Sequence, residues 1–168
     1  MAEKKVLMIL SPHGFDDGQY ETCRRVIEGR GHKVSVASLG TLATGVGGRT
    51  VPVDVAIKDV KSYDYDGVVF IGGEGAVRLF DDETALKLAK DVKYKPVAAS
   101  DNGIVLLALA GAIEGKKVTG PVEQAGWLVK GKAKYTNEPL TVDDKLITIR
   151  DAGMVEQMAG RLVEALEK

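Results

Sequence analysis

The sequence predicts a doubly wound, three-layer α/β fold built around a mostly parallel sheet. Short apolar runs alternate with segments of helical periodicity, which is the order required by parallel strands that helices connect. The runs at residues 6–10 and 68–71 contain no polar residue, as expected of strands covered on both faces. A short strand, a sharp turn and a helix then follow in direct succession at residues 95–111.

The first helix is predicted at residues 20–30, after the strand at 6–10. Cys23 and Ile27 lie on one apolar side of this helix. Gly29 marks its end, because glycine readily takes the backbone conformation that closes a helix.

A second buried strand is predicted at residues 34–37, and a glycine-rich stretch follows at 39–50. That stretch is too flexible for a helix and predicts an irregular loop or a small hairpin. The strand at 68–71 ends at Gly72 and Gly73, which predict a tight turn.

The C-terminal half continues the alternation of strands and helices. Asp81 and Asp82 precede one helix, where the helix dipole favours acidic residues. Two short apolar runs around a polar turn predict a hairpin. The predicted elements are helices at 84–92 and 154–166, a strand at 97–99, and hairpin strands at 140–142 and 146–149.

The segment at residues 95–104 has the pattern of a nucleophile elbow, in which a tight bend lifts one side chain clear of the sheet. The lifted residue is Asp101. Because ligands bind at the carboxyl ends of strands in such sheets, the elbow predicts a carboxylate in a pocket. Asp101 also fits a purely structural role, since Asp tolerates strained backbone better than most residues.

Two other loops, at residues 11–18 and 72–76, follow strands at the same edge of the predicted sheet. We therefore expect one cleft to form where these loops meet the elbow. The residues expected at this cleft are Asp16, Gly73, Glu74, Asp101 and Asn102, with His13 and Gly103 as further pocket candidates.

Several of these candidates also fit simpler roles. Asp16 can cap the helix that follows it, as acidic residues often do. His13 can supply a base, or can simply be an exposed loop residue. Gly73 can serve the tight turn alone, whatever the chemistry of the cleft.

The chain resembles the ThiJ/PfpI superfamily, and most of all its PfpI-type intracellular protease/amidases. The similarity runs from about Lys5 to the C-terminus and implies the flavodoxin-like, class I glutamine-amidotransferase-like fold. The segments that carry it are Val-Leu-Met-Ile-Leu at 6–10, Gly-Phe-Asp-Asp at 14–17, Gly-His-Lys-Val-Ser-Val-Ala-Ser at 31–38, Tyr-Asp-Gly-Val-Val-Phe-Ile-Gly-Gly at 65–73, the elbow, and Gly-Lys-Lys-Val-Thr at 115–119.

The chain differs from the proteins it resembles at the positions that carry out catalysis in them. Similar proteins carry Cys-His-Gly-Pro at the elbow, where residues 101–104 are Asp-Asn-Gly-Ile. Their Glu after the first strand matches Asp16, and their later His before Pro matches Gly120. They also use backbone N–H groups matching Gly73 and Glu74 as an oxyanion hole. Cysteine hydrolysis needs a thiolate and a base, so we do not expect protease or amidase activity.

No cofactor is expected. The glycines at residues 45–48 lack the strand-to-helix setting of a phosphate loop and the Lys-Ser/Thr that follows one. The loop at 11–16 is not the hydroxyl-rich phosphate loop of flavodoxins, which argues against FMN.

Three other residues are expected to have structural roles. Cys23 is predicted to be a small buried hydrophobe, His32 to be structural, and Trp127 to pack.

The composition predicts one domain over residues 1–168. Apolar residues make up 45% of the chain and charged residues 28%, with a net charge of −1, so no nucleic-acid partner is expected. The longest apolar stretch, at 104–112, is too short to span a membrane. The residues before the first strand are too few for a signal-peptide core, and together these features predict a cytoplasmic protein.

Three functions remain open from the sequence. Loss of the thiol and both histidines favours a homologue without cysteine chemistry that binds a small molecule or a partner. Alternatively, Asp101 is the nucleophile or general base of a hydrolase or lyase, with Asp16 close enough to share its proton and raise one pKa. In the third, Asp16 and Asp101, with His13 or Glu74, bind a divalent cation, because oxygen ligands suit hard metals.

Self-association as a homodimer or a higher assembly of dimers is implied by the resemblance. The residues expected to form an apolar surface patch for it are Tyr20, Phe80, Trp127 and Leu128.

Overall fold

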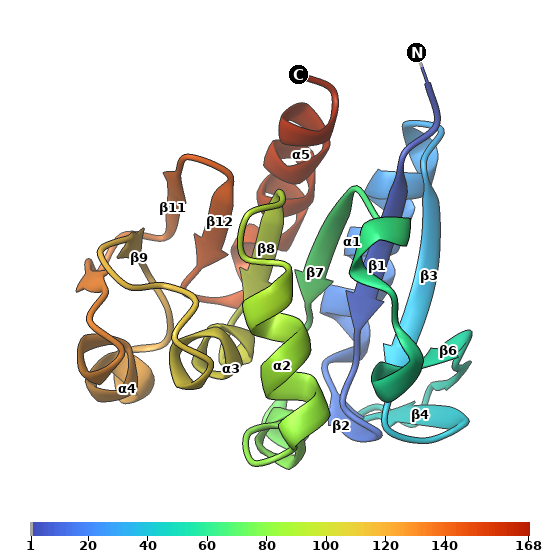
Figure 1. Ribbon diagram of the computed structural model, residues 1–168, viewed down its shortest axis with the longest axis horizontal. Helices are drawn as coiled ribbons and strands as arrows, with labels where there is room; N and C mark the ends of the chain where they lie inside the picture. The colour runs from blue at the N-terminus through green and yellow to red at the C-terminus, as the bar shows by residue number, and fades with distance from the viewer. Residues whose placement is uncertain (1) are drawn as a thin grey trace.

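The computed structural model describes residues 2–168 and contains a seven-stranded sheet as its middle layer (Figure 1). The strand order is β11-β12-β8-β7-β1-β3-β6, and every neighbouring pair is parallel except β11 and β12. The predicted fold class is therefore confirmed. The strands are β1 (Lys5–Ile9), β3 (Lys33–Ser38), β6 (Val55–Ala56), β7 (Gly67–Phe70), β8 (Val97–Ser100), β11 (Leu140–Asp143) and β12 (Leu146–Ile149).

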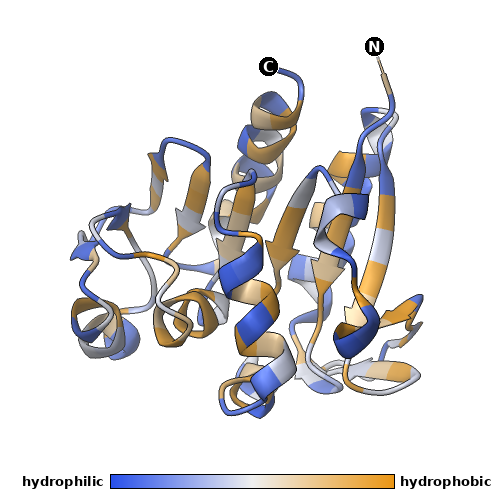
Figure 2. Ribbon diagram, in the orientation of Figure 1, coloured by the Kyte–Doolittle hydropathy of each residue, from blue (hydrophilic) through white to orange (hydrophobic). Residues whose placement is uncertain are grey.

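Helices cover both faces of this sheet because side chains alternate between the faces along each strand. Met8 and Leu10 pack with α1 (Asp17–Gly29) and α5 (Val155–Leu166), whereas Leu7 and Ile9 face the opposite layer. Figure 2 shows the apolar residues concentrated on the strands and polar residues on the outer face of α2 (Glu83–Asp91). The second layer consists of α2, α3 (Gly103–Leu109) and α4 (Ala125–Lys130).

The register of the parallel strands decides which loops become neighbours. Phe70 pairs with Ala99, and Ser100 pairs with Ile149. The residues that follow these strands therefore emerge side by side at one edge. Asp101 and Arg150, each the first residue after its strand, occupy equivalent places on adjacent strands.

The helix starts differ from the predicted ones because of capping. α1 begins at Asp17, three residues before the predicted start, and the Asp16 carboxylate accepts a hydrogen bond of 2.9 Å from the Gln19 N–H. Asp82 caps α2 in the same way, by accepting from the Ala85 N–H.

The glycine-rich stretch forms the small hairpin that was one of its two predicted structures. Its strands are β4 (Leu42–Gly45) and β5 (Thr50–Pro52), and β2 (His13–Phe15), which was not predicted, pairs with β4 to complete a three-stranded sheet. The short helices are η1 (Ile57–Asp59), η2 (Ser62–Asp64), η3 (Glu74–Leu79), η4 (Val122–Gln124) and η5 (Ala152–Met154).

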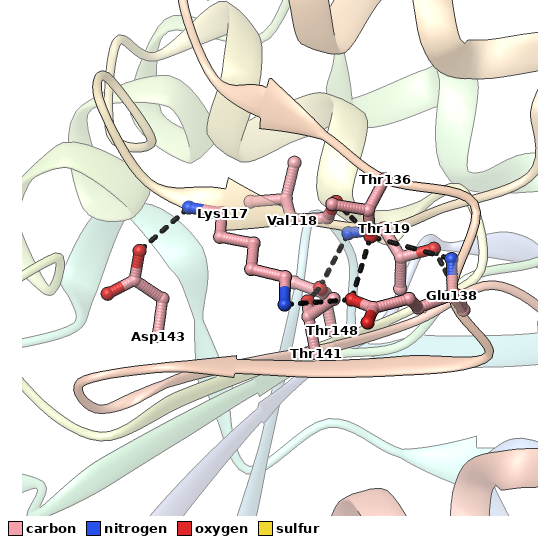
Figure 3. A network of polar contacts seen from close by, with 8 residues as sticks. All are labelled: Lys117, Val118, Thr119, Thr136, Glu138, Thr141, Asp143 and Thr148. Atoms are coloured by element: carbon pink, nitrogen blue, oxygen red, sulfur yellow. Dashed lines mark hydrogen bonds and ion pairs between the residues drawn. The ribbon is translucent and has the colours of Figure 1, made fainter.

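A polar network joins the two-stranded sheet of β9 (Lys117–Val118) and β10 (Lys134–Tyr135) to the β11–β12 hairpin (Figure 3). The buried Thr148 hydroxyl accepts from the Thr119 N–H at 3.0 Å and also contacts the Thr141 hydroxyl. The Thr119 hydroxyl in turn donates to the carbonyl oxygen of Glu138. The network thus fixes the start of the loop that runs from Thr119 to η4.

The predicted surface patch is wrong as a set. Tyr20 and Leu128 are buried in α1 and α4, because each is on the apolar side of its helix. Trp127, expected to pack, is 46% exposed.

Along the described part of the chain, from residue 2 onward, no helix is long and apolar enough to cross a membrane. The cytoplasmic location stays a prediction.

Candidate functional site

The turn between β8 and α3 places Asp101 at the carboxyl edge of the sheet. Asp101 has a φ of 52°, in the left-handed region that Asp enters more readily than most residues. The turn is tight on both sides, since a Cβ on Gly103 would lie 2.6 Å from the Phe70 carbonyl oxygen. A Cβ on Gly72 would lie 2.5 Å from the Ser100 carbonyl oxygen. The strand, sharp turn and helix predicted for this segment are all present.

Asn102 braces the elbow against the loop that follows β7. The Gly73 N–H donates to the Asn102 side-chain oxygen at 2.9 Å, and the Asn102 amide donates to the Gly73 carbonyl oxygen at 2.9 Å. The Gly73 N–H is therefore already engaged. It does not offer the free oxyanion-hole donor that the resemblance implied.

The first of two hollows at this edge lies between the elbow, the loop after β1 and the turn of the β4–β5 hairpin. Its volume is about 350 Å³. Asp17 shapes one wall, because its carboxylate accepts from the N–H groups of Gly47 at 2.7 Å and Arg49 at 3.0 Å. Burial raises the pKa of Asp17, but these two bonds, a bond from its own N–H and the charge of Arg49 together outweigh that effect and hold the pKa below its ordinary value. The lining includes Asp16, Asp17, Val46, Gly73, Glu74 and Asp101.

The second hollow lies on the other side of Asp101 and has a volume of about 530 Å³. Its far wall is the loop from Thr119 to η4, which the polar network of Figure 3 holds in place. Arg150, beside the elbow, donates to the Asn137 carbonyl oxygen at 2.7 Å and lies 3.4 Å from an Asp151 carboxylate oxygen. The lining includes Asp101, Pro121, Val122, Glu123, Arg150 and Asp151.

Gln19 is a site residue that the sequence reasoning missed. It lies in the first turn of α1 and is 1% exposed. Ser100, the residue before the elbow, accepts from the Gly72 N–H at 3.0 Å and donates to the Gln19 side-chain oxygen at 2.5 Å. This bond fixes the oxygen end of the amide, and the Gln19 amide also acts on the Asp101 carboxyl group, whose pKa it lowers.

The ionisation of Asp101 reflects this crowded position. Burial raises the pKa of Asp101, and the nearby carboxylates of Asp16 and Glu123 raise it further. The Gln19 amide and the Asn102 N–H act in the opposite direction, because they favour the charged form. The net effect is a pKa above the ordinary value, which is typical of functional carboxylates and also of structural ones.

The structure therefore brings together four of the predicted residues in the first hollow, Asp16, Gly73, Glu74 and Asp101. Asp16 does so while also capping α1, so its two possible roles are compatible. Asn102 is beside them as a brace, with its side chain occupied. Like Asn102, two further predicted pocket residues do not line either hollow: His13 is exposed on β2, and Gly103 is buried behind the elbow.

The acidic residues do not form a metal site. Within residues 2–168, no group of three or more His, Cys, Asp or Glu side chains is placed to hold a metal ion. Asp16 is turned toward the start of α1 and Asp17 toward the β4–β5 turn, so the carboxylates are spread around the rims. The interpretation as a divalent-cation site is therefore not supported.

Two other features lie apart from the elbow. The thiol of Cys23 is buried on the sheet side of α1, and burial raises its pKa to about 12. A separate hollow of about 380 Å³ lies at the opposite edge of the sheet, against the first residues of β8 and β12. Its lining carries charges of both signs and none of the predicted site residues.

Comparison with known proteins places these observations in a family context. The model of the DJ-1/PfpI family matches residues 4–165. The chain is 32% identical over 151 residues to the deglycase TK1284 of Thermococcus kodakarensis, covering 88% of this chain and 90% of that protein. It is 28% identical over 169 residues to the glutathione-independent glyoxalase DJR-1.2 of Caenorhabditis elegans, covering 99% of this chain and 90% of that protein.

A solved structure agrees with the fold over the whole chain. The ThiJ/PfpI domain protein from Brachyspira murdochii has a TM-score of 0.93 at 26% identity, covering 99% of this chain and 98% of that one. The names of the relatives cover more than one activity, so similarity alone does not select among them.

Proposed function

Because the chain belongs to the DJ-1/PfpI family and carries Asp101 at the elbow, we propose that it is a member without a nucleophilic cysteine that binds a small polar molecule there. The observation that carries this proposal is the pairing of Asp101 at the elbow with a single, fully buried cysteine elsewhere. The elbow is the position that the strand-turn-helix geometry presents to a ligand. In this chain that position offers a carboxylate.

Thiol chemistry at Cys23 is disfavoured on two grounds. The thiolate is the reactive form of cysteine, and a pKa of about 12 keeps almost none of it at neutral pH. The side chain also packs in the core between α1 and the sheet, out of reach of either hollow.

Binding is favoured because two hollows meet at Asp101. The carboxyl edge of an open α/β sheet is the usual place for a ligand. The elbow backbone is held by the paired bonds between Asn102 and Gly73, so that a ligand would meet a formed surface. The proposal covers a small molecule with hydrogen-bond donors that can reach the Asp101 carboxylate.

The test has a catalytic arm and a binding arm. Purified protein is assayed with peptide, amide and glyoxal substrates, and no thiol-dependent turnover is expected. Turnover that disappears in Cys23→Ala would overturn the proposal. In the binding arm, small molecules are screened by thermal shift, and at least one class is expected to stabilise the wild type but not Asp101→Asn.

A second candidate function is an enzyme that uses Asp101 as general base or nucleophile. The raised pKa of Asp101, with Asp16 as one of its causes, favours it, because a catalytic base works best with a pKa closer to the working pH. A screen of hydrolase and lyase substrates that need no thiol separates the two functions. Turnover lost in Asp101→Asn and retained in Cys23→Ala would establish the enzyme.

A further inference from the structure

We propose that the ligand of the elbow is an aliphatic amine with at least two ammonium groups, which spans both hollows across Asp101. This inference rests on the proposed binding function and specifies the chemical class of the ligand. It follows from the charge of the rims, from the buried Gln19 amide, and from the apolar residues between the charges.

Carboxylates dominate both hollows. The first is lined by Asp16, Asp17 and Glu74 in addition to Asp101, and no Lys, Arg or His is among its lining residues. The second adds Glu123 and Asp151. Charges of one sign in a cleft attract ligands of the other sign.

The one basic residue of the second hollow is already engaged. Arg150 lies 3.4 Å from the Asp151 carboxylate and donates to the Asn137 carbonyl oxygen. It balances Asp151, and within residues 2–168 neither Glu123 nor Asp101 belongs to an ion pair. An anionic ligand would have to approach these two carboxylates.

Gln19 gives an independent indication that the site favours the ionised form of Asp101. Among residues 2–168, its Nε2 group is one of the buried side-chain polar atoms without a hydrogen-bond partner. The Ser100 hydroxyl holds the oxygen end of the amide, and the Gln19 amide acts on the Asp101 carboxyl group, where it favours the charged form and lowers the pKa. A buried, unpaired donor is costly, and here its one favourable use is to support an ionised Asp101. A ligand cation would supply the counter-charge.

The spread of the acidic groups favours an elongated organic cation over a metal ion. A metal needs several ligands around one point, and no such group is present in the described chain. Each hollow also has a well-exposed valine, Val46 at 58% in the first and Val122 at 63% in the second. Methylene groups of an aliphatic amine can pack against these side chains while the ammonium ends meet carboxylates on either side of Asp101.

The experiment is calorimetric titration of the whole chain with the diamine putrescine and the triamine spermidine. The controls are n-butylamine, which has one ammonium group, and n-butanol, which has none. Putrescine is expected to bind roughly five- to tenfold more tightly than n-butylamine, from the second set of exposed ion pairs. Added salt should weaken putrescine binding, because the rims are open to solvent.

Charge-neutral variants locate the two ends of the ligand. Glu74→Gln in the first hollow and Glu123→Gln in the second should each weaken putrescine binding by roughly two- to fivefold. Glu164→Gln is the matched control, since Glu164 is an exposed acid on α5 outside both hollows, and its affinity should equal that of the wild type. Equal affinity for putrescine and n-butylamine, or an equal loss in all three variants, would refute the spanning amine.

Neutral probes with hydrogen-bond donors separate failure of this inference from failure of the proposed function. If glycerol or urea binds in an Asp101-dependent way and the amines do not, the ligand class is wrong and the binding function stands. If no probe of any class shows binding that Asp101→Asn removes, both are wrong.

Discussion

At the scale of single residues, Asp101 is the most informative position, because a half-buried carboxyl group stands there between Asp16 and Glu123. We expect Asp101→Asn to raise the free energy of unfolding at neutral pH by on the order of 0.2–1 kcal/mol, the size of interactions between exposed charges. Asn also accepts the left-handed backbone, so the elbow should be retained.

The direction of the pKa shift determines at which pH Asp101→Asn raises the free energy of unfolding. The pKa of Asp101 is raised in the folded state, so the folded protein holds this proton more tightly than the unfolded chain. The contribution of Asp101 to stability is therefore fully present below the ordinary Asp value and is lost as the pH rises through the folded pKa. The gain of Asp101→Asn should vanish in acid and appear as the pH rises, which chemical denaturation at several pH values measures. A variant less stable than wild type at neutral pH would contradict this.

Cys23 provides a second prediction at this scale. With its thiol buried and its pKa raised to about 12, it should react with a thiol reagent at neutral pH only when the chain opens. Mass spectrometry of samples with and without denaturant measures this, with little labelling expected in the native protein and one label per chain after unfolding. Rapid labelling of the native protein would show that the site is accessible.

Sequence reasoning located the elbow carboxylate, because the strand-turn-helix pattern is local to a few residues. It missed Gln19, which is tied to Ser100 across 81 positions of the chain. The spacing of Asp16 and Gln19 is that of a helix capping box, so the available signal pointed to a structural role. The Asp16 N–H instead donates to the Gly72 carbonyl oxygen, and the Gln19 side chain is free to turn toward the elbow.

At the scale of elements, Thr148 connects the sheet to the wall of the second hollow. Thr148→Val removes the oxygen that accepts from the Thr119 N–H and leaves that buried donor unpaired. We expect a loss of about 1–3 kcal/mol in the free energy of unfolding, measured by urea denaturation. Thr136→Val is the matched comparison, because the Thr136 hydroxyl bonds near the surface, and its loss should be smaller. An equal loss of stability in Thr148→Val and Thr136→Val would show that the buried bond to the Thr119 N–H contributes no more than a surface bond.

Strands and helices were predicted correctly where the pattern of apolar residues extends over several residues. The buried strands and the terminal helix have uninterrupted or periodic apolar residues, and their positions agree within a few residues. β9 and β10 have two residues each, which is too short for any periodicity. α4 has six residues and exposes Trp127 and Val129, so its amphipathic pattern is weak.

At the scale of the whole molecule, self-association stays a prediction, now with a surface that keeps Trp127 from the expected patch and replaces its buried members. Val122, Trp127 and Val129 are well exposed on or beside α4, whereas two residues of the expected patch are buried. We expect light scattering to give a mass of at least two chains, and Trp127→Glu to lower it by placing a charge in the contact. A mass near the 17.9 kDa of one chain at all concentrations would rule this out.

The paired bonds between Asn102 and Gly73 have a consequence for the thermodynamics of recognition. They join the loops after two adjacent strands before any ligand arrives, so the binding surface is preorganised. Little conformational entropy is then lost on binding, so the free energy of binding a small ligand is not reduced by a cost of ordering these loops. The Gly73 amide should accordingly exchange its hydrogen slowly in the free protein, with little further slowing when the hollows are filled.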